Sequence, residues 1–329
     1  MSSAQRTDAF ALVGEDRRRE RPQPPHGARR MVSKDKVIVT VALNGGMQQD
    51  REGCVVPKQP DEIAEAAFEC WQAGAAMVHV HARGKDGRNT GDQAVYGEII
   101  RQIRARCPVL IQTTNGIGVR RNPATGEFIW PTDKERLGLL ALEPRQDVFG
   151  IAAGSADFYN PEGGYPAETP YVNSPELLRE TIQRVYAMGA ALEYEVVEAS
   201  SLHRLLRYAE EGLFDRSRRN IWLLHGGGFG STPAIARNVL FNVDEGLRLF
   251  PQAIWGVTGT GRDMFPLCTL GLSMGCDLVR IGLEDGIHRA NGKPARNNRD
   301  MVEDIVQIAA VFGRSPASVD EARDRFLTV

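Results

Sequence analysis

The sequence contains few cysteines and no long apolar stretch. Its five cysteines are scattered over 329 residues without a C-x-x-C pair, which argues against a disulfide framework and fits a reducing compartment. No apolar run approaches the ~18–20 residues that cross a bilayer, and the N-terminus lacks the apolar segment of a secretory signal. The formal net charge of −2 gives no broad attraction to nucleic acid or to a membrane surface. We therefore expect a cytoplasmic protein that binds neither nucleic acid nor membrane.

The first 34 residues differ from the rest of the chain. They include an arginine-rich stretch that three prolines interrupt. Such a segment buries too little apolar surface to offset the entropy lost on ordering. We therefore expect a flexible tail over residues 1–34 and a single catalytic domain over residues 35–329, with Met31 as an alternative start of the protein. An arginine-rich transit peptide is the other interpretation, and the acidic residues of the segment argue against it.

From residue 36 onward, short β-branched runs alternate with stretches of helical periodicity. Eight such units follow one another without a break, which favours a closed (β/α)8 TIM barrel over an open doubly wound sheet. Two long loops, 115–134 and 155–174, are expected to serve as lids or subunit contacts. The predicted strands are 37–42, 77–82, 109–114, 147–152, 192–197, 221–225, 254–258 and 277–282, and the predicted helices are 60–73, 94–106, 134–142, 175–188, 200–212, 233–248, 264–274 and 297–313.

Two histidines stand two residues apart in the second predicted strand. Residues i and i+2 of a strand point to the same side, so His79 and His81 share one face near the strand's C-terminal end. In a TIM barrel that end carries the active site. Buried core histidines are the alternative interpretation. Two imidazoles in a strand otherwise made of Val and Ala favour half of a metal site.

Two adjacent acids follow the eighth predicted strand, which lies near the second strand around a closed barrel. Glu284 and Asp285 are costly to place beside a core without a partner cation. We expect Glu284 as the third metal ligand and Asp285 as a base, with a solvated turn as the alternative. A set of two His and one Glu leaves coordination positions open for substrate, as a catalytic zinc requires.

Polar residues at other strand ends complete the predicted site. Thr113, Thr114 and Asn115 end the third strand beside the histidines and are candidates for holding a substrate carboxylate, although strand-end capping explains them too. Arg280, inside the eighth strand, needs an anion such as Asp285 or the substrate.

Two glycine-rich turns and one acidic strand add further candidates. Gly228 follows the sixth strand, and Gly261 and Arg262 follow the seventh. Glycines let backbone N–H groups approach an anion, so we expect these residues to bind a phosphate-bearing cosubstrate. In the fifth strand Glu193 and Glu195 share one face, and we expect at least one of them to reach the active site or a buried arginine.

Five different motifs lie at or near the predicted strand ends. Their order and spacing together are a more specific indication of a protein family than any one motif alone. They are His79-Val80-His81-Ala82-Arg83, Gln112-Thr113-Thr114-Asn115-Gly116, Glu193-x-Glu195, Gly259-x-Gly261-Arg262 and Arg280-x-Gly282-x-Glu284-Asp285. With these motifs the chain resembles the β-keto acid cleavage enzymes over about residues 36–327.

This resemblance implies a homotetrameric barrel with zinc, or another divalent metal, on His79, His81 and Glu284. It implies that a β-keto acid and the cosubstrate acetyl-CoA give acetoacetate and a new acyl-CoA by Claisen and retro-Claisen steps. Asp285, supported by Arg280, would take the α-proton of the keto acid, whose acidity a metal raises.

Three further roles follow from the same resemblance. Thr114 matches a serine of the family that holds the substrate, and Glu195 matches the family's strand-5 glutamate. Members that act on amino-bearing keto acids carry a glutamate where this chain has Met47. Met47 is therefore a predicted substrate-binding position, and it lacks the charge that would pair with an ammonium group.

Two alternatives to this function remain open from the residues. A metal-dependent barrel hydrolase would use a zinc-bound water, and it usually has further ligands on strands 5 and 6, where only His225 fits. A non-catalytic barrel would keep a structural metal, which four protein ligands normally enclose.

Overall fold

The protein was studied as a computed structural model. It describes residues 35–122, 124–160, 165–217, 220–228 and 230–327. The predicted tail, residues 1–34, lies outside the described residues. Among the described residues, no helix combines the length and apolar character that a membrane crossing needs.

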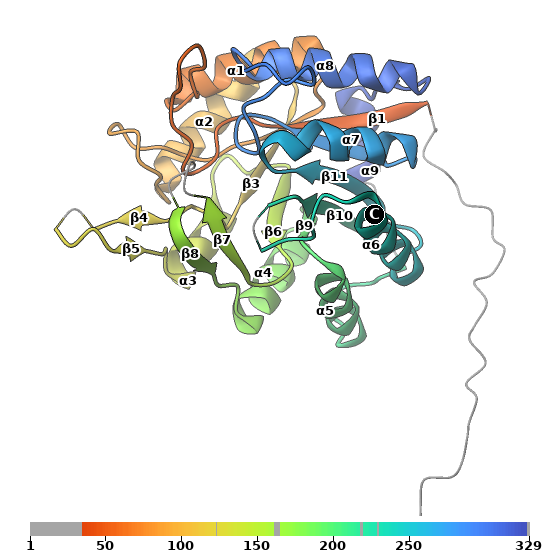
Figure 1. The fold of residues 1–329 in the computed structure, drawn as a ribbon. Coiled ribbons are helices and arrows are strands. Elements are labelled where there is room, and N and C mark those ends of the chain that lie inside the picture. The colour runs from red at the N-terminus through yellow and green to blue at the C-terminus, as the bar shows by residue number, and fades with distance from the viewer. Residues whose placement is uncertain (1–34, 123, 161–164, 218–219, 229, 328–329) are drawn as a thin grey trace, which may run out of the picture. The chain divides into compact units, whose positions relative to one another are not determined.

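Eight parallel strands close into a barrel that helices surround, which confirms the predicted (β/α)8 fold (Figure 1). Neighbouring strands pair in chain order, and the last pairs with the first: Val39 lies opposite Val279. The strands are β1 (Lys36–Ala42), β2 (Met77–His79), β3 (Leu110–Thr114), β6 (Val148–Ala152), β9 (Ala191–Val196), β10 (Ile221–Gly226), β11 (Ile254–Gly259) and β12 (Leu278–Ile281).

The helices follow the predicted positions closely, except that the predicted helix 134–142 is divided in two and that the last helix of the chain was not predicted. They are α1 (Pro60–Ala73), α2 (Gln93–Arg106), α3 (Asp133–Gly138), α4 (Pro175–Ala187), α5 (Ala199–Glu210), α6 (Ala236–Leu249), α7 (Met264–Ser273), α8 (Asn298–Val311) and α9 (Val319–Leu327), with the 3-10 turns η1 (Leu139–Ala141) and η2 (Gly261–Asp263). Side-chain caps define several starts, because they satisfy backbone N–H groups that the first helical turn leaves free. Asp92 accepts from Ala94 at α2, Ser174 from Leu177 at α4.

Both long loops contain a two-stranded hairpin. The first holds β4 (Arg120–Arg121) and β5 (Phe128–Ile129), and the second holds β7 (Ala156–Asn160) and β8 (Tyr165–Tyr171). Because they follow β3 and β6, both hairpins lie at the end of the barrel where the strands finish (Figure 1).

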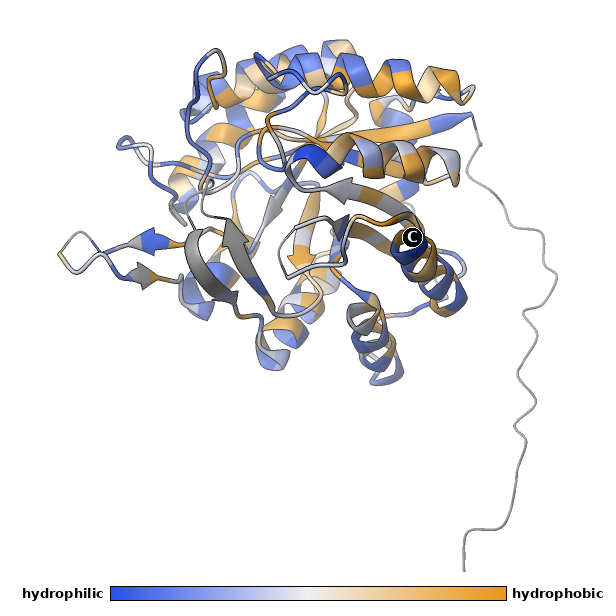
Figure 2. Ribbon diagram, viewed as in Figure 1, coloured by the Kyte–Doolittle hydropathy of each residue, from blue (hydrophilic) through white to orange (hydrophobic). Residues whose placement is uncertain are grey.

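The strands separate two cores. Residues such as Val39, Val78 and Ile111 face outward and pack under the helices, which carry hydrophobic and hydrophilic residues on different sides (Figure 2). The alternate residues face the barrel interior, where an apolar layer closes the lower part and α9 packs against it with Ala322 and Phe326. That layer consists of Ile38, Met77, Leu110, Val148, Ala191, Ile221, Ile254 and Leu278. Burial of each large side chain contributes roughly 1.5–3 kcal/mol.

A polar layer lies directly above the apolar one. Two residues further along the same strands, the inward face carries Thr40, His79, Gln112, Glu193 and Arg280, all buried. Buried polar groups require hydrogen-bond or charge partners, so the contacts among these side chains decide how each of them is oriented.

The second strand is shorter than predicted. It ends at His79, whereas the prediction extended it to residue 82. Beyond that point the Asn44 side chain replaces a strand partner. Its Oδ1 accepts from the backbone N–H of His81 at 3.0 Å, and its Nδ2 donates to the His81 carbonyl at 2.8 Å.

Candidate active site

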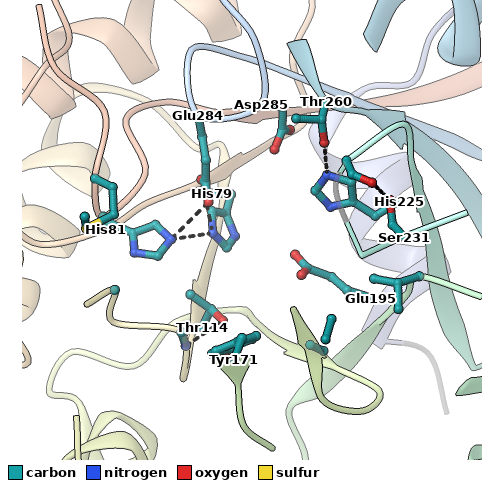
Figure 3. Close-up of a pocket in the computed structure, with 18 of the residues that line it drawn as sticks. His79, His81, Thr114, Tyr171, Glu195, His225, Ser231, Thr260, Glu284 and Asp285 are labelled. Carbon is teal, nitrogen blue, oxygen red and sulfur yellow. Dashed lines mark hydrogen bonds and ion pairs between the residues drawn. The ribbon is translucent and has the colours of Figure 1, made fainter. Parts of the chain in front are cut away.

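His79, His81 and Glu284 converge at one corner of the barrel mouth, as the sequence predicted (Figure 3). The two Nε2 atoms lie 3.1 Å apart. Glu284 lies 3.5 Å from His79 Nε2 through Oε2 and 3.3 Å from His81 Nε2 through Oε1. Three donors from strands at opposite ends of the chain therefore face one point.

The spacing of these donor atoms fits a divalent cation. Tetrahedral zinc with bonds of ~2.0–2.1 Å keeps its ligand atoms about 3.3 Å apart, which is close to the three separations above. The Oε2 atom of Glu284 is buried and has no hydrogen-bond partner among the described residues. Three protein donors leave room for a substrate, whereas a structural zinc site usually has four.

Gln112 orients the first histidine. Its Nε2 donates to Glu193 Oε1 at 2.9 Å, so its Oε1 faces His79 Nδ1 at 2.8 Å. An amide oxygen only accepts, hence His79 carries its proton on Nδ1 and presents a lone pair from Nε2. Burial lowers the pKa of His79 to about 4. The imidazole is therefore neutral at pH 7, as a metal ligand must be.

The segment after β1, residues 44–48, ties the two ligand-bearing ends together; we call it the β1 loop. Asn44 holds the His81 backbone, and Gln48 Nε2 donates to the Glu284 carbonyl at 2.6 Å. Gly45 has a φ of +57°, and a Cβ there would lie 2.8 Å from Glu284 Cγ. Only glycine therefore allows the loop to pack this closely against the ligand.

Arg83, the last residue of the histidine motif, anchors the β1 loop from below. Its guanidinium is buried and donates to the carbonyls of Asn44, Gly45 and Gln48 at 3.2, 2.7 and 2.9 Å. A planar fork with five donors suits several carbonyls at once. Arg83 thus acts on the site through the loop and not by contact with the ligand atoms.

Arg280 joins the carboxylates on the opposite side of Glu284. It donates to both oxygens of Asp285, at 2.8 and 2.9 Å, and to Glu195 at 2.8 Å. Burial raises the pKa of Asp285, and this effect outweighs the attraction of Arg280. Burial would also raise the pKa of Glu284, but the two imidazoles and Arg280 hold it well below its usual range. Glu195 reaches the arginine, as predicted, whereas Glu193 pairs with Gln112.

A pocket of about 210 Å³ opens beside these groups. Figure 3 shows Thr114 and Tyr171 across from the histidines, and His225, hydrogen-bonded to Thr260 at 3.0 Å, at the far end. Met47 and Gly228 line the same pocket, as do Glu195, Arg280, Glu284 and Asp285.

Two predicted substrate residues do not line this pocket. Thr113 and Asn115 are buried, but they alternate with Gln112 and Thr114 and so face the other side of β3. The Asn115 carbonyl accepts from Arg136 Nε at 3.1 Å. The period of a strand, applied to the whole run from 112 to 115, already separates Thr114 from its two neighbours.

A second cavity of about 950 Å³ adjoins the pocket. We call it the arginine cavity, because Arg51, Arg83, Arg88, Arg120 and Arg262 line it. Gly261 also lines it, but its N–H donates to the Asp285 carbonyl at 2.6 Å and is not directed at a ligand. Arg262 is exposed. The predicted phosphate residues are therefore divided, with Gly228 in the pocket and the other two in the arginine cavity.

Several site residues were not predicted. Gln112, Asn44 and Gln48 contact the three candidate ligands. Trp130 and Tyr171 line the pocket from the hairpin loops. Inward strand position was a signal for Gln112 only. The others reach the site from loops, whose path no periodicity describes.

Comparison with known proteins agrees with this geometry. The model of the beta-keto acid cleavage enzyme family matches residues 36–327. The 3-keto-5-aminohexanoate cleavage enzyme of Fusobacterium nucleatum is 30% identical over 293 residues, 88% of this chain and 97% of that protein. The 3,5-dioxohexanoate:acetyl-CoA acetone transferase of Paraburkholderia graminis is 29% identical over 310 residues, 89% of this chain and 96% of that protein.

A solved structure shares the fold. ObcA in its binary complex with oxaloacetate superposes with a TM-score of 0.67 at 19% identity, covering 82% of this chain and 67% of ObcA. The family model matches well over half of this sequence, and a relative with 30% identity aligns over 88% of it. The chain therefore belongs to the beta-keto acid cleavage enzyme family.

Proposed function

We propose that this enzyme transfers acyl groups between a β-keto acid and acetyl-CoA, giving acetoacetate and a new acyl-CoA, with zinc on His79, His81 and Glu284. The observation that carries the proposal is a carboxylate, Asp285, fixed by both arms of Arg280 directly beside a three-ligand site that leaves room for substrate. When bound, the cation supplies polarisation of the ketone and carboxylate oxygens of a β-keto acid.

In this proposal Asp285 accepts a proton from the carbon between the ketone and the carboxylate. That carbon forms a bond to the acetyl carbonyl of acetyl-CoA, and the CoA thiolate leaves. The thiolate then attacks the original ketone carbon, and the bond between this carbon and the former α-carbon breaks. Asp285 returns its proton to the former α-carbon. The products are acetoacetate and the acyl-CoA of the keto acid.

The remaining side chains bind and orient. Arg280 holds Asp285 in place through two hydrogen bonds and donates a third hydrogen bond to the carboxylate of Glu195. Thr114 offers its hydroxyl to the substrate carboxylate from across the pocket. We propose that the phosphates of CoA occupy the arginine cavity, because this cavity shares Glu284 and Asp285 with the pocket and contains Arg88 and Arg262.

The hydrolase alternative has less support. It expected a further ligand from strand 6, yet His225 is bound to Thr260 and is not among the residues grouped around the histidine pair. Family membership also favours acyl transfer.

The test uses purified enzyme, acetyl-CoA and a set of β-keto acids. Acetoacetate should form only when acetyl-CoA is present; hydrolysis of substrate without it would support the hydrolase. Asp285→Asn should lower turnover by about 100- to 10,000-fold and retain zinc by elemental analysis. His79→Gln is the matched control and should lose the metal. Loss of metal in Asp285→Asn instead would mean that Asp285, not Glu284, is the ligand.

A further inference from the structure

The pocket contains a histidine that the proposed reaction does not use. In β10 the side chains of Ile221 and Leu223 face the barrel interior, and the period of the strand directs His225 to the same side. Its partner across the sheet, Thr258, also faces inward, because its hydroxyl lies 3.4 Å from Asp285 Oδ2. His225 therefore enters the pocket from the strand next to the one that contacts the proposed base.

The same side of the pocket holds two carboxylates. Burial would raise the pKa of Glu195, but Arg280 and, after it, His225 hold that pKa below its ordinary value. Burial raises the pKa of Asp285, and His225 is one of the groups that oppose this rise. Such interactions weaken with distance, so the imidazole lies near both carboxylates. Figure 3 shows His225 and Glu195 together at the end of the pocket away from the histidine pair.

One ring nitrogen of His225 is open to the pocket. Nε2 faces the Thr260 hydroxyl at 3.0 Å. Nδ1 has no hydrogen-bond partner among the residues that the structure describes, and it is not one of the buried atoms that lack a partner, so it is accessible. When the Thr260 hydroxyl donates to Nε2, a neutral imidazole carries its proton on Nδ1. The ring then offers an N–H donor to a molecule at this end of the pocket.

The neighbouring donors already have acceptors within the protein. Arg280 donates to Asp285 and Glu195, and the Ser231 hydroxyl donates to the Gly228 carbonyl at 2.8 Å. The acetyl carbonyl must come within bonding reach of the carbon that loses its proton to Asp285, so it enters the region beside these carboxylates. Addition to this carbonyl makes its oxygen negative, and the carboxylates repel that charge. A donor aimed at a developing oxyanion offsets such repulsion and accelerates acyl transfer.

We propose that His225 is a further catalytic residue of the acyl transfer proposed above, a function on which this inference rests. Its Nδ1–H donates a hydrogen bond to the carbonyl oxygen of the acetyl thioester, and the bond strengthens as the α-carbon adds and the oxygen becomes negative. When the CoA thiolate leaves, this oxygen becomes a ketone oxygen and the bond weakens again. His225 transfers no proton, and Thr260 keeps its ring in the required tautomer.

The test uses acetoacetate and acetyl-CoA that carries an isotopic label in its acetyl group. Acetoacetate is a product of the proposed reaction for any β-keto acid, so this probe does not depend on the tail of the substrate. Its α-carbon forms a bond to the labelled acetyl group, and its original acetyl group leaves as unlabelled acetyl-CoA. Mass spectrometry therefore follows transfer as label that enters acetoacetate. Exchange of the α-hydrogens of acetoacetate in deuterium oxide, without acetyl-CoA, measures proton removal by Asp285 alone.

His225→Asn and His225→Gln form a matched pair. The amide nitrogen of Asn can occupy the place of Nδ1, whereas the longer Gln side chain places its amide near Nε2 and Thr260. Loss of an oxyanion donor should lower kcat for transfer by about 100- to 1,000-fold in His225→Gln, with KM for acetyl-CoA nearly unchanged. His225→Asn should retain a kcat at least about tenfold higher than that of His225→Gln. Deuterium exchange and zinc content should equal those of the wild type in both variants.

The outcomes separate the inference from the proposed function. His203→Gln, at an exposed histidine of α5, is the control and should transfer label like the wild type. Wild-type transfer in His225→Gln overturns the inference and leaves the proposed function intact, and so does faster transfer in His225→Gln than in His225→Asn. An equal loss of transfer and of deuterium exchange also overturns it, because His225 would then act on proton removal. If the wild-type enzyme transfers no label, the proposed function itself fails.

Discussion

Gln112→Met should weaken metal binding and destabilise the barrel together. The amide makes two buried hydrogen bonds, 2.8 Å to His79 and 2.9 Å to Glu193. Methionine has a similar volume, so the change creates little cavity, but it leaves two buried polar groups without a partner. Each such group costs about 1–3 kcal/mol, so the free energy of unfolding should fall by roughly 2–6 kcal/mol.

The effect on the metal is separate from the effect on folding. A group that orients a histidine ligand typically changes metal affinity by about 10–100-fold. Competition with a chelating dye measures the zinc dissociation constant, and urea unfolding of metal-stripped protein measures stability. Gln102→Met is the control, since the side-chain hydrogen bonds of Gln102 join it to Glu98 and Arg106 of the same helix, α2, away from the site. Wild-type affinity and stability in Gln112→Met would refute the orienting role.

Two further predictions concern buried charge. Burial raises the pKa of Glu193 from its ordinary 4.5 to about 7, so the folded state binds this proton more tightly than the unfolded state. Stability from this group is present below pH 4.5 and is lost as the pH rises to 7, by about 3 kcal/mol. Glu193→Gln should therefore gain stability relative to wild type between pH 4.5 and 8 in urea titrations; an equal difference at both pH values contradicts this. Arg83→Lys keeps the charge but loses the planar fork that binds the β1 loop, so zinc affinity should fall about tenfold in the dye assay, and unchanged affinity would show that the loop does not depend on Arg83.

The barrel tolerates the buried charges of its polar layer because these charges pair with one another. Arg280 is surrounded by three carboxylates, and each of its strong contacts is a charge-assisted hydrogen bond. Removing one member of such a group is far more costly than the group's net contribution to stability. The apolar layer below supplies the burial that a stable fold requires, while the layer above carries the chemistry.

The fold could be predicted because its signals are local. Eight runs with strand composition, each followed by helical periodicity, need no long-range information to be recognised, and the predicted strands differ from the observed ones mainly at their ends. The histidine pair belongs to the same class of signal, since the two-residue period of a strand orients both side chains. The same period, applied to Thr113 and Asn115, would have excluded them from the pocket.

Contacts that hold the ligands could not be read from residue order. Gln48 binds the carbonyl of Glu284, 236 positions away, and Arg83 binds carbonyls of the β1 loop. A backbone carbonyl is the same in every residue, so no side-chain pattern identifies it as a partner. The lining of the pocket likewise combines residues from the β1 loop, β3 and both hairpin loops, and only closure of the barrel brings these segments together. Residue order thus specified the scaffold and the candidate metal-ligating side chains, whereas their orientation and the shape of the pocket depend on contacts between distant segments.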